Sequence, residues 1–110
     1  MQKIFISVAQ RIATAAQGTC AVQDNADYLV EFSFDPEWEN FAVKSAVFVW
    51  QEGEGTVAEF VSFSGNVAPM PKISGSRYVL IGVTAGEGVS STAVKIPCIP
   101  SVITHAGRGE

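Results

Sequence analysis

Residues 28–34 read Tyr28-Leu-Val-Glu-Phe-Ser-Phe34, and their alternation is the clearest indication of the fold class. Large apolar side chains occupy every second position, while Glu31 and Ser33 alternate with them. A period of two is typical of a β-strand with one buried face and one solvated face. The apolar set predicted to face the core is Tyr28, Val30, Phe32 and Phe34. Asp35-Pro36-Glu37 follows and predicts a turn, because Pro36 restricts φ to values that suit the second position of a turn.

Outward from this strand, runs rich in β-branched and aromatic residues recur between clusters of turn residues. The turns are predicted at Asp24–Asp27, Glu52–Gly55 and Gly86–Gly88. Because turns this short join only antiparallel strands, we expect an all-β fold, an antiparallel immunoglobulin-like β-sandwich of about seven strands. The seven predicted strands are Lys3–Val8, Gly18–Val22, Tyr28–Phe34, Ala42–Gln51, Thr56–Ser64, Arg77–Ala85 and Ser91–Cys98.

Two segments depart from the simple alternation of buried and solvated residues. In Arg77–Ala85 both alternating sets are apolar or small, which predicts a central strand covered on much of both faces, with Val79, Ile81, Val83 and Ala85 turned inward. Residues Val8–Gln17 form the best helical candidate, yet the run is short and ends at Gly18. A strand that bends away is an equally good interpretation of that run.

The length of 110 residues suits one domain, which we place at residues 1–100, with a polar C-terminal tail at 101–110. The chain is 47% hydrophobic and 16% charged, and its net charge is −4. Lys and Arg are dispersed, so we expect no nucleic-acid partner and no membrane partner. The apolar run at residues 4–9 is too short for a secretory signal, and we expect synthesis in a cytoplasm.

Cys20 and Cys98 are the two cysteines, and they allow two interpretations. They could form the disulfide of a secreted immunoglobulin-type domain. Alternatively, they are buried thiols that act as small apolar residues, which cytoplasmic synthesis favours. Neither cysteine belongs to a C-x-x-C pair, so no zinc site is predicted.

The sequence shows no catalytic pattern. The single histidine, His105, lies in the tail, where no fixed partner would position it as a general base. No G-x-S-x-G motif is present. Carboxylates gather at residues 24–31 and 35–39 without the spacing of a known calcium loop, and we interpret them as turn-capping and solvated groups. We therefore expect no enzymatic activity, no metal and no cofactor.

Aromatic residues could form a platform for a sugar ring, but most occupy strand positions predicted to face the core. The candidates are Trp38, Phe41, Trp50, Phe60, Phe63 and Tyr78. Trp38 lies instead on the Asp35–Asn40 corner. It either closes the end of the sandwich or contacts a glycan or a protein partner.

Three short motifs carry a resemblance to a known family. Phe32, Phe34, Asp35 and Trp38 form the pattern F-x-F-D-x-x-W; Lys44, Ala46 and Phe48 form K-x-A-x-F; and a strand ends in Leu80-Ile-Gly-Val83. Together they resemble the immunoglobulin-like β-sandwich modules of tailed-phage virion proteins, found in baseplate, fibre-anchoring and head or tail decoration proteins. The resemblance covers about residues 24–98. The chain departs from it by lacking a long fibre segment and a cysteine-proline feature at residues 69–76.

The resemblance implies a non-enzymatic structural protein of a tailed-phage virion that packs on or between capsid or tail subunits. Its expected partners are other virion subunits, including copies of itself, and its expected location is the virion after synthesis in the host cytoplasm. Val102 and Ile103 in the tail are predicted partner contacts. The alternative function is a carbohydrate-binding module that contacts host-surface glycans through Trp38.

Overall fold

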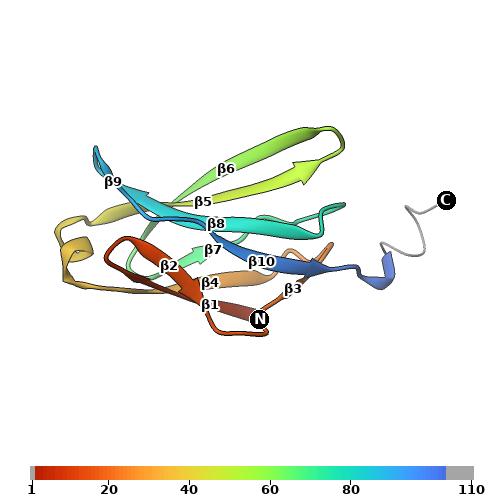
Figure 1. Ribbon diagram of the computed structural model, residues 1–110, viewed down its shortest axis with the longest axis horizontal. Helices are drawn as coiled ribbons and strands as arrows, with labels where there is room; N and C mark the ends of the chain where they lie inside the picture. Colours follow the sequence, from red (N-terminus) through yellow and green to blue (C-terminus); the bar gives the residue numbers. More distant parts are fainter. Residues whose placement is uncertain (1, 104–110) are drawn as a thin grey trace.

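The computed structural model describes residues 2–103, and within them it contains ten strands and one short 3-10 helix (Figure 1). The all-β class is therefore confirmed. The elements are β1 (Gln2–Ala9), β2 (Ile12–Ala15), β3 (Ala21–Val22), β4 (Tyr28–Phe34), η1 (Pro36–Asn40), β5 (Val43–Glu52), β6 (Gly55–Ser64), β7 (Val67–Pro69), β8 (Tyr78–Ala85), β9 (Val89–Ser90) and β10 (Val94–Ile99).

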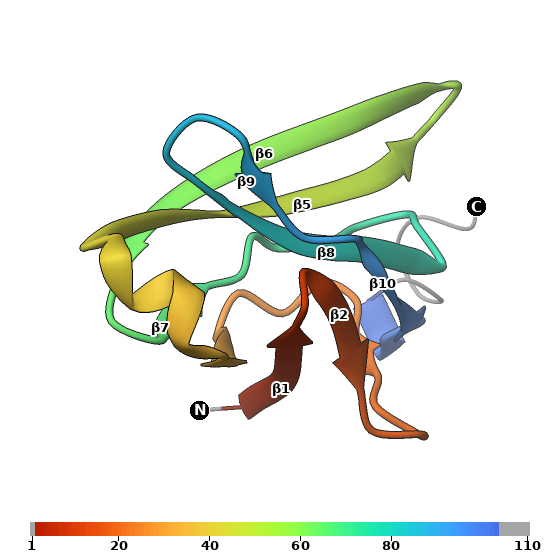
Figure 2. The same ribbon diagram turned by 60° about the vertical axis from the view of Figure 1, so that its left-hand side comes forward.

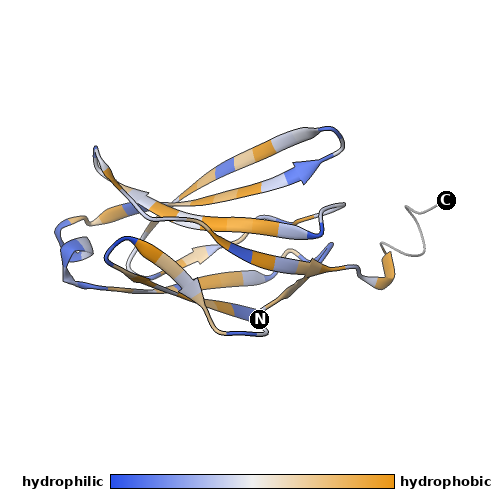
Figure 3. Cartoon of the chain, viewed as in Figure 1, coloured by the Kyte–Doolittle hydropathy of each residue, from blue (hydrophilic) through white to orange (hydrophobic). Residues whose placement is uncertain are grey.

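The strands form two sheets that face each other, as in a β-sandwich. The smaller sheet has the order β2-β1-β4-β7, and the larger one has the order β3-β10-β8-β5-β6, with β9 paired to β8. In Figure 1, β1, β2 and β4 of the smaller sheet lie below β5, β6 and β8 of the larger one. Hydrophobic and polar residues alternate in bands along the strands of both sheets (Figure 3), so each sheet turns an apolar face toward the other.

The prediction of a purely antiparallel fold was wrong at two places. β1 pairs in parallel with β4, so that Ile4 lies opposite Val30 and Ile6 opposite Phe32. β3 likewise pairs in parallel with β10. The prediction followed from the short turns, which constrain only strands that are consecutive in the chain. β1 and β4 are separated by residues 10–27, which contain β2 and β3, and a connection of that length permits a parallel pair.

Most predicted strands match observed ones, with Tyr28–Phe34 identical in its bounds. The inward set of β8 is also confirmed, and this strand lies between β10 and β5. The predicted strand at residues 18–22 contracts to Ala21–Val22, and β2, β7 and β9 were not predicted. Residues 8–17 form no helix, because the chain reverses at Gln10 and Arg11 with φ values of 52° and 65°. Neither residue type signals such left-handed geometry, so the hairpin was missed.

A single hydrophobic core fills the space between the sheets. Its aromatic part is a stack in which the Phe32 ring lies 5.3 Å from Phe34 and 5.4 Å from Phe63, measured between centroids. The largest completely buried side chains are Trp38, Phe32, Phe48, Ile4, Ile6, Ile81 and Ile96. The core therefore draws equally on strands of both sheets.

The two open sides of the sandwich differ. On one side, the connection between β9 and β10 joins the sheets: the Thr92 backbone N–H donates to the Arg11 carbonyl at 2.8 Å, and the Ala13 N–H donates to Thr92 Oγ1 at 3.0 Å. On the other side β6 is the last strand of the larger sheet, and no strand within residues 2–103 pairs with its outer edge. The far end of the β5–β6 hairpin reaches away from the smaller sheet (Figure 2).

Candidate interaction surface

Trp38 is completely buried, with 0% of its side chain exposed. It lies on η1, which begins at Pro36, a residue suited to a first helical position. The Trp38 N–H donates to the Asp35 carbonyl at 3.2 Å, and the Phe41 N–H donates to the Trp38 carbonyl at 3.2 Å. This short turn carries the indole inward against Phe34, so Trp38 closes the end of the sandwich. A buried ring offers no face to a sugar, which removes Trp38 as the predicted glycan or partner contact.

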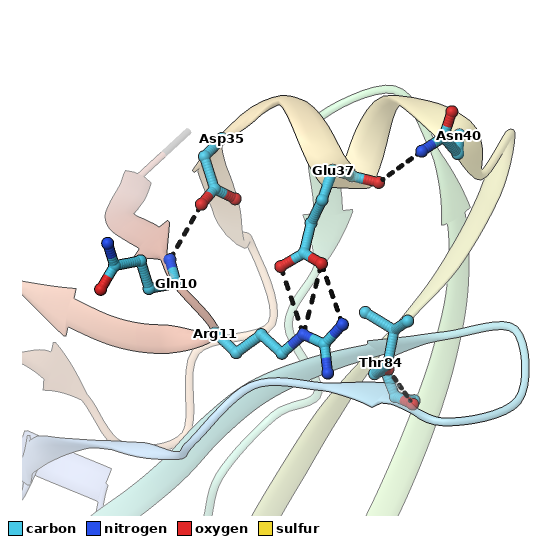
Figure 4. A network of polar contacts seen from close by, with 7 residues as sticks. Gln10, Arg11, Asp35, Glu37, Asn40 and Thr84 are labelled. Atoms are coloured by element: carbon cyan, nitrogen blue, oxygen red, sulfur yellow. Dashed lines mark hydrogen bonds and ion pairs between the residues drawn. The ribbon is translucent and has the colours of Figure 1, made fainter.

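Polar contacts fasten the β1–β2 turn to the same corner (Figure 4). The Gln10 N–H donates to Asp35 Oδ2 at 2.8 Å, and Arg11 Nη2 lies 3.0 Å from Glu37 Oε1. The hydrogen bond and the charge of Glu37 raise the pKa of Arg11 further above its ordinary value, so the guanidinium is fully charged at neutral pH. These groups bind one another, so their role is to hold the β1–β2 turn against the corner.

The two cysteines are free thiols with different surroundings. In the β3–β10 pair Ala21 lies opposite Cys98, and both are buried. Cys20 precedes Ala21 and is exposed, because successive side chains of an extended chain point to opposite faces. The prediction of two buried thiols was thus wrong for Cys20, and the structure contains no Cys20–Cys98 disulfide. Burial, with a smaller contribution from Cys20, raises the pKa of Cys98 to about 11, so that thiol is un-ionised at neutral pH.

The carboxylates at residues 24–31 and 35–39 form hydrogen bonds and ion pairs within the protein. Among residues 2–103, no three His, Cys, Asp or Glu side chains lie close enough to hold a metal ion. Asp24 instead accepts hydrogen bonds from Ser74 Oγ at 2.9 Å and Ser101 Oγ at 2.7 Å. His105 lies outside the described residues. In the same part of the chain, no helix has the length and apolar character needed to cross a membrane.

Val102 and Ile103 are exposed at the C-terminal end of the described chain, by 76% and 58%. The preceding residue, Ser101, is tied to Asp24 by its hydroxyl. Two adjacent apolar side chains therefore lie in solvent next to an anchored position. Their role as partner contacts stays a prediction, and residues 104–110 lie outside the described part.

The outer face of the larger sheet carries apolar side chains from three strands, of which Phe60 is strongly exposed and Val47, Val49 and Leu80 are half-buried. Val47 on β5 lies opposite Phe60 on β6 and Gly82 on β8, and Val49 lies opposite Leu80. All these side chains point away from the core. The connection that leads to β10 packs closely over Gly82, and a hollow of about 250 Å³ lies beside it, lined by Val47, Phe60 and Leu80.

Phe60 is 65% exposed, which contradicts its predicted place in the core. The inward set of β6 follows the register with β5, in which Lys44 lies opposite Phe63 and Ala46 opposite Val61. Phe60 is out of phase with Val61 and Phe63, and the sequence contained that signal. The prediction placed Phe60 in the core because it is aromatic, although its position in the alternation faces outward.

A second hollow lies over the outer face of the smaller sheet. It has a volume of about 690 Å³ and runs between β1 and the segment that leads from β2 to β3. Phe5, which is 61% exposed, and Cys20 line it, and Lys3 forms an ion pair with Glu31 at 3.1 Å beside it. Both sheets therefore present an exposed phenylalanine on their outer faces.

Comparisons of this chain with protein-family models, curated proteins and solved structures found no match. The resemblance to phage modules accordingly remains based on the three motifs alone.

Proposed function

We propose that this protein is a non-enzymatic structural subunit of a tailed-phage virion, with an immunoglobulin-like fold, that packs on or between capsid or tail subunits. The apolar outer face of the larger sheet, formed by Val47, Val49, Phe60 and Leu80, is the observation that carries this proposal. Contiguous apolar surface in water is unfavourable, and its burial gains about 25 cal/mol per Å². In a particle, neighbouring subunits would cover such a face and remove it from water.

The motif residues support the same assignment through their arrangement. The rings of Phe34 and Trp38 pack against each other at the corner. The Lys44 ammonium group lies 5.0 Å from the centre of the Phe34 ring and donates to the Phe41 carbonyl at 3.0 Å. Residues from two of the three motifs thus meet in one structural cluster. Motifs that build a core, with no reactive group among them, suit a module whose task is assembly.

The expected partners are protein surfaces of the particle. The chain has a net charge of −4, and its Lys and Arg residues are dispersed, which disfavours contact with packaged nucleic acid. The proposed location is the virion, after synthesis in the host cytoplasm. Partner subunits that bind the outer faces of the sheets would not disturb the buried Trp38 corner or the core.

The direct test is mass spectrometry of tailed-phage particles purified by density gradient from cells that carry the gene. Peptides of this protein should be present in amounts well above those of abundant host proteins. Their absence from intact particles would exclude the virion role.

A pair of variants tests the outer face itself. Val49→Lys places a charge on the apolar face, whereas Gln51→Lys places the same charge two residues along the same face, where the side chain is already polar. Particles should incorporate Q51K like the wild type and should lose V49K. Equal incorporation of both would show that the outer face is not the contact surface.

A further inference from the structure

The outer edge of β6 is unlike the other sheet edges of the described chain. β6 has ten residues, whereas the other terminal strands, β2, β3 and β7, have four, two and three. Natural proteins protect long edges with charges, prolines or bulges, since exposed N–H and C=O groups pair readily with another strand. β6 contains no proline, and Glu59 is its one charged residue. A long edge that lacks this protection is suited to accept a strand.

The hairpin geometry fixes which backbone groups are free. Gly53 and Glu54 form a two-residue turn, so Glu52 and Gly55 form the hydrogen-bonded pair beside it. Hydrogen-bonded and non-hydrogen-bonded pairs then alternate along an antiparallel ladder. The N–H and C=O groups of Phe60 consequently point away from β5, as do those of its neighbours two residues away on either side.

We propose that β6 pairs antiparallel with β6 of a second copy, about a two-fold axis at Phe60, and so extends the larger sheet across both copies. This inference deepens the proposed assembly function, on which it rests, by naming one partner and its surface. A two-fold axis makes the interface self-complementary. If one residue of the first copy faces another residue of the second copy, the same two residues also face each other with the copies exchanged.

The strand matches itself in this register. Phe60 lies opposite Phe60 of the second copy, Ala58 opposite Ser62, and Thr56 opposite Ser64, all on the outer face. These five positions per copy supply roughly ten backbone hydrogen bonds, two for each hydrogen-bonded pair. On the inner face Glu59 lies opposite Val61, so the two carboxylates do not oppose each other. A register centred on Glu59 would place like charges together, which is destabilising.

The apolar surface around Phe60 favours a second copy of this chain as the partner. The Phe60 pair would continue the cross-strand contact of Val47 and Phe60 into the second copy, which covers the most exposed aromatic ring on the larger sheet. Aromatic pairs directly across two strands are among the stabilising cross-strand pairs. The far end of the hairpin reaches away from the smaller sheet (Figure 2), so that sheet does not block the approach of a second β6 there.

Sedimentation velocity of the isolated full chain, from about 1 to about 100 μM, tests the dimer. The wild type should sediment as a dimer at the upper end. Phe60→Glu places two carboxylates opposite each other at the axis and should weaken dimerisation at least tenfold, by roughly the cost of a like-charge pair. Phe5→Glu is the matched control, because Phe5 is similarly exposed on the other sheet, and it should dimerise like the wild type. A monomeric wild type, or a dimer that F60E retains or F5E loses, would overturn the inference.

Disulfide trapping tests the register. In a Cys20→Ser background, a mixture of the Ala58→Cys and Ser62→Cys chains should yield a cross-linked heterodimer under mild oxidation, since these positions lie opposite each other. A58C alone should yield none, and a cross-linked A58C homodimer would refute the register. The outcomes also separate the two proposals. A monomer that particles still incorporate refutes the dimer alone, and a dimer that particles exclude refutes the virion function.

Discussion

The indole ring of Trp38 lies 5.2 Å from the ring of Phe34, centroid to centroid, and is completely buried. Phe34 ends β4 and Trp38 lies within the 3-10 helix that follows, so the contact folds the corner back onto the strand that leads into it. The F-x-F-D-x-x-W pattern therefore places a ring contact between the end of the strand and the corner that follows it. Its aromatic residues close one end of the core.

Trp38→Ala should lower the free energy of unfolding by about 3–5 kcal/mol, because it removes a large buried side chain and leaves a cavity. Phe60→Ala is the control: it deletes an aromatic ring that is mostly exposed and should change stability by less than about 1 kcal/mol in the monomer. Urea unfolding followed by circular dichroism at low protein concentration measures both. Equal losses for the two variants would contradict the burial of Trp38.

Gln10→Val should destabilise the protein by roughly 1–2 kcal/mol, because a β-branched side chain is strained at a φ of 52°. Gln10→Asn should leave stability unchanged or raise it slightly, since Asn tolerates left-handed geometry. Neither change removes the backbone N–H that donates to Asp35. Gln51→Val, at an exposed strand position, is the control and should be close to neutral. Equal melting temperatures for Q10V and Q51V in thermal unfolding would argue against the left-handed turn.

The two thiols should react at very different rates. Cys20 is exposed and should react with a disulfide reagent within minutes at pH 8, whereas Cys98 is buried and un-ionised at that pH. A titration should therefore count one thiol in the native protein and two after unfolding without reductant. Two rapidly reacting thiols in the native state would show that Cys98 is accessible. None after unfolding would reveal a disulfide.

Stability should fall in alkaline solution partly because of Cys98. Its pKa is raised to about 11 in the folded state, so the folded protein keeps a proton that the unfolded chain releases at lower pH. The stabilising contribution is complete below the unfolded pKa, near 8.5, and is lost as pH rises toward about 11. Chemical unfolding of the wild type and of Cys98→Ala between pH 8 and pH 11 should show the gap between them narrowing. Parallel curves would show that the thiol does not contribute.

Deletion of residues 101–110 should leave the isolated domain folded and change its stability by less than about 1 kcal/mol. Ser101 donates a hydrogen bond to Asp24, and Val102 and Ile103 are exposed, so few apolar contacts of the described residues would be lost. The same deletion should weaken incorporation into particles if these side chains bind a neighbouring subunit. Thermal melts and a particle-binding assay measure the two effects separately. A large drop in melting temperature would show that the tail belongs to the core.

Local patterns in the sequence were sufficient for the strands and for much of the core. The alternation at residues 28–34 predicted the bounds and the buried face of β4, and the doubly apolar run at residues 77–85 predicted the central place of β8. Glycines in the short turns predicted the β5–β6 hairpin. These predictions succeed because side-chain period and turn chemistry depend only on nearby residues.

The tertiary structure alone decided the parallel pairs, the burial of Trp38 and the free edge of β6. A period of two assigns side chains to faces, but it says nothing about which distant strand lies alongside, so the β1–β4 pair left no mark in the sequence. Trp38 could face inward or outward until its corner was placed against Phe34. β6 is the terminal strand of the larger sheet because its partner β5 pairs with β8 on the other edge. Strand partners are set by contacts between residues far apart in the chain, and only the folded chain contains them.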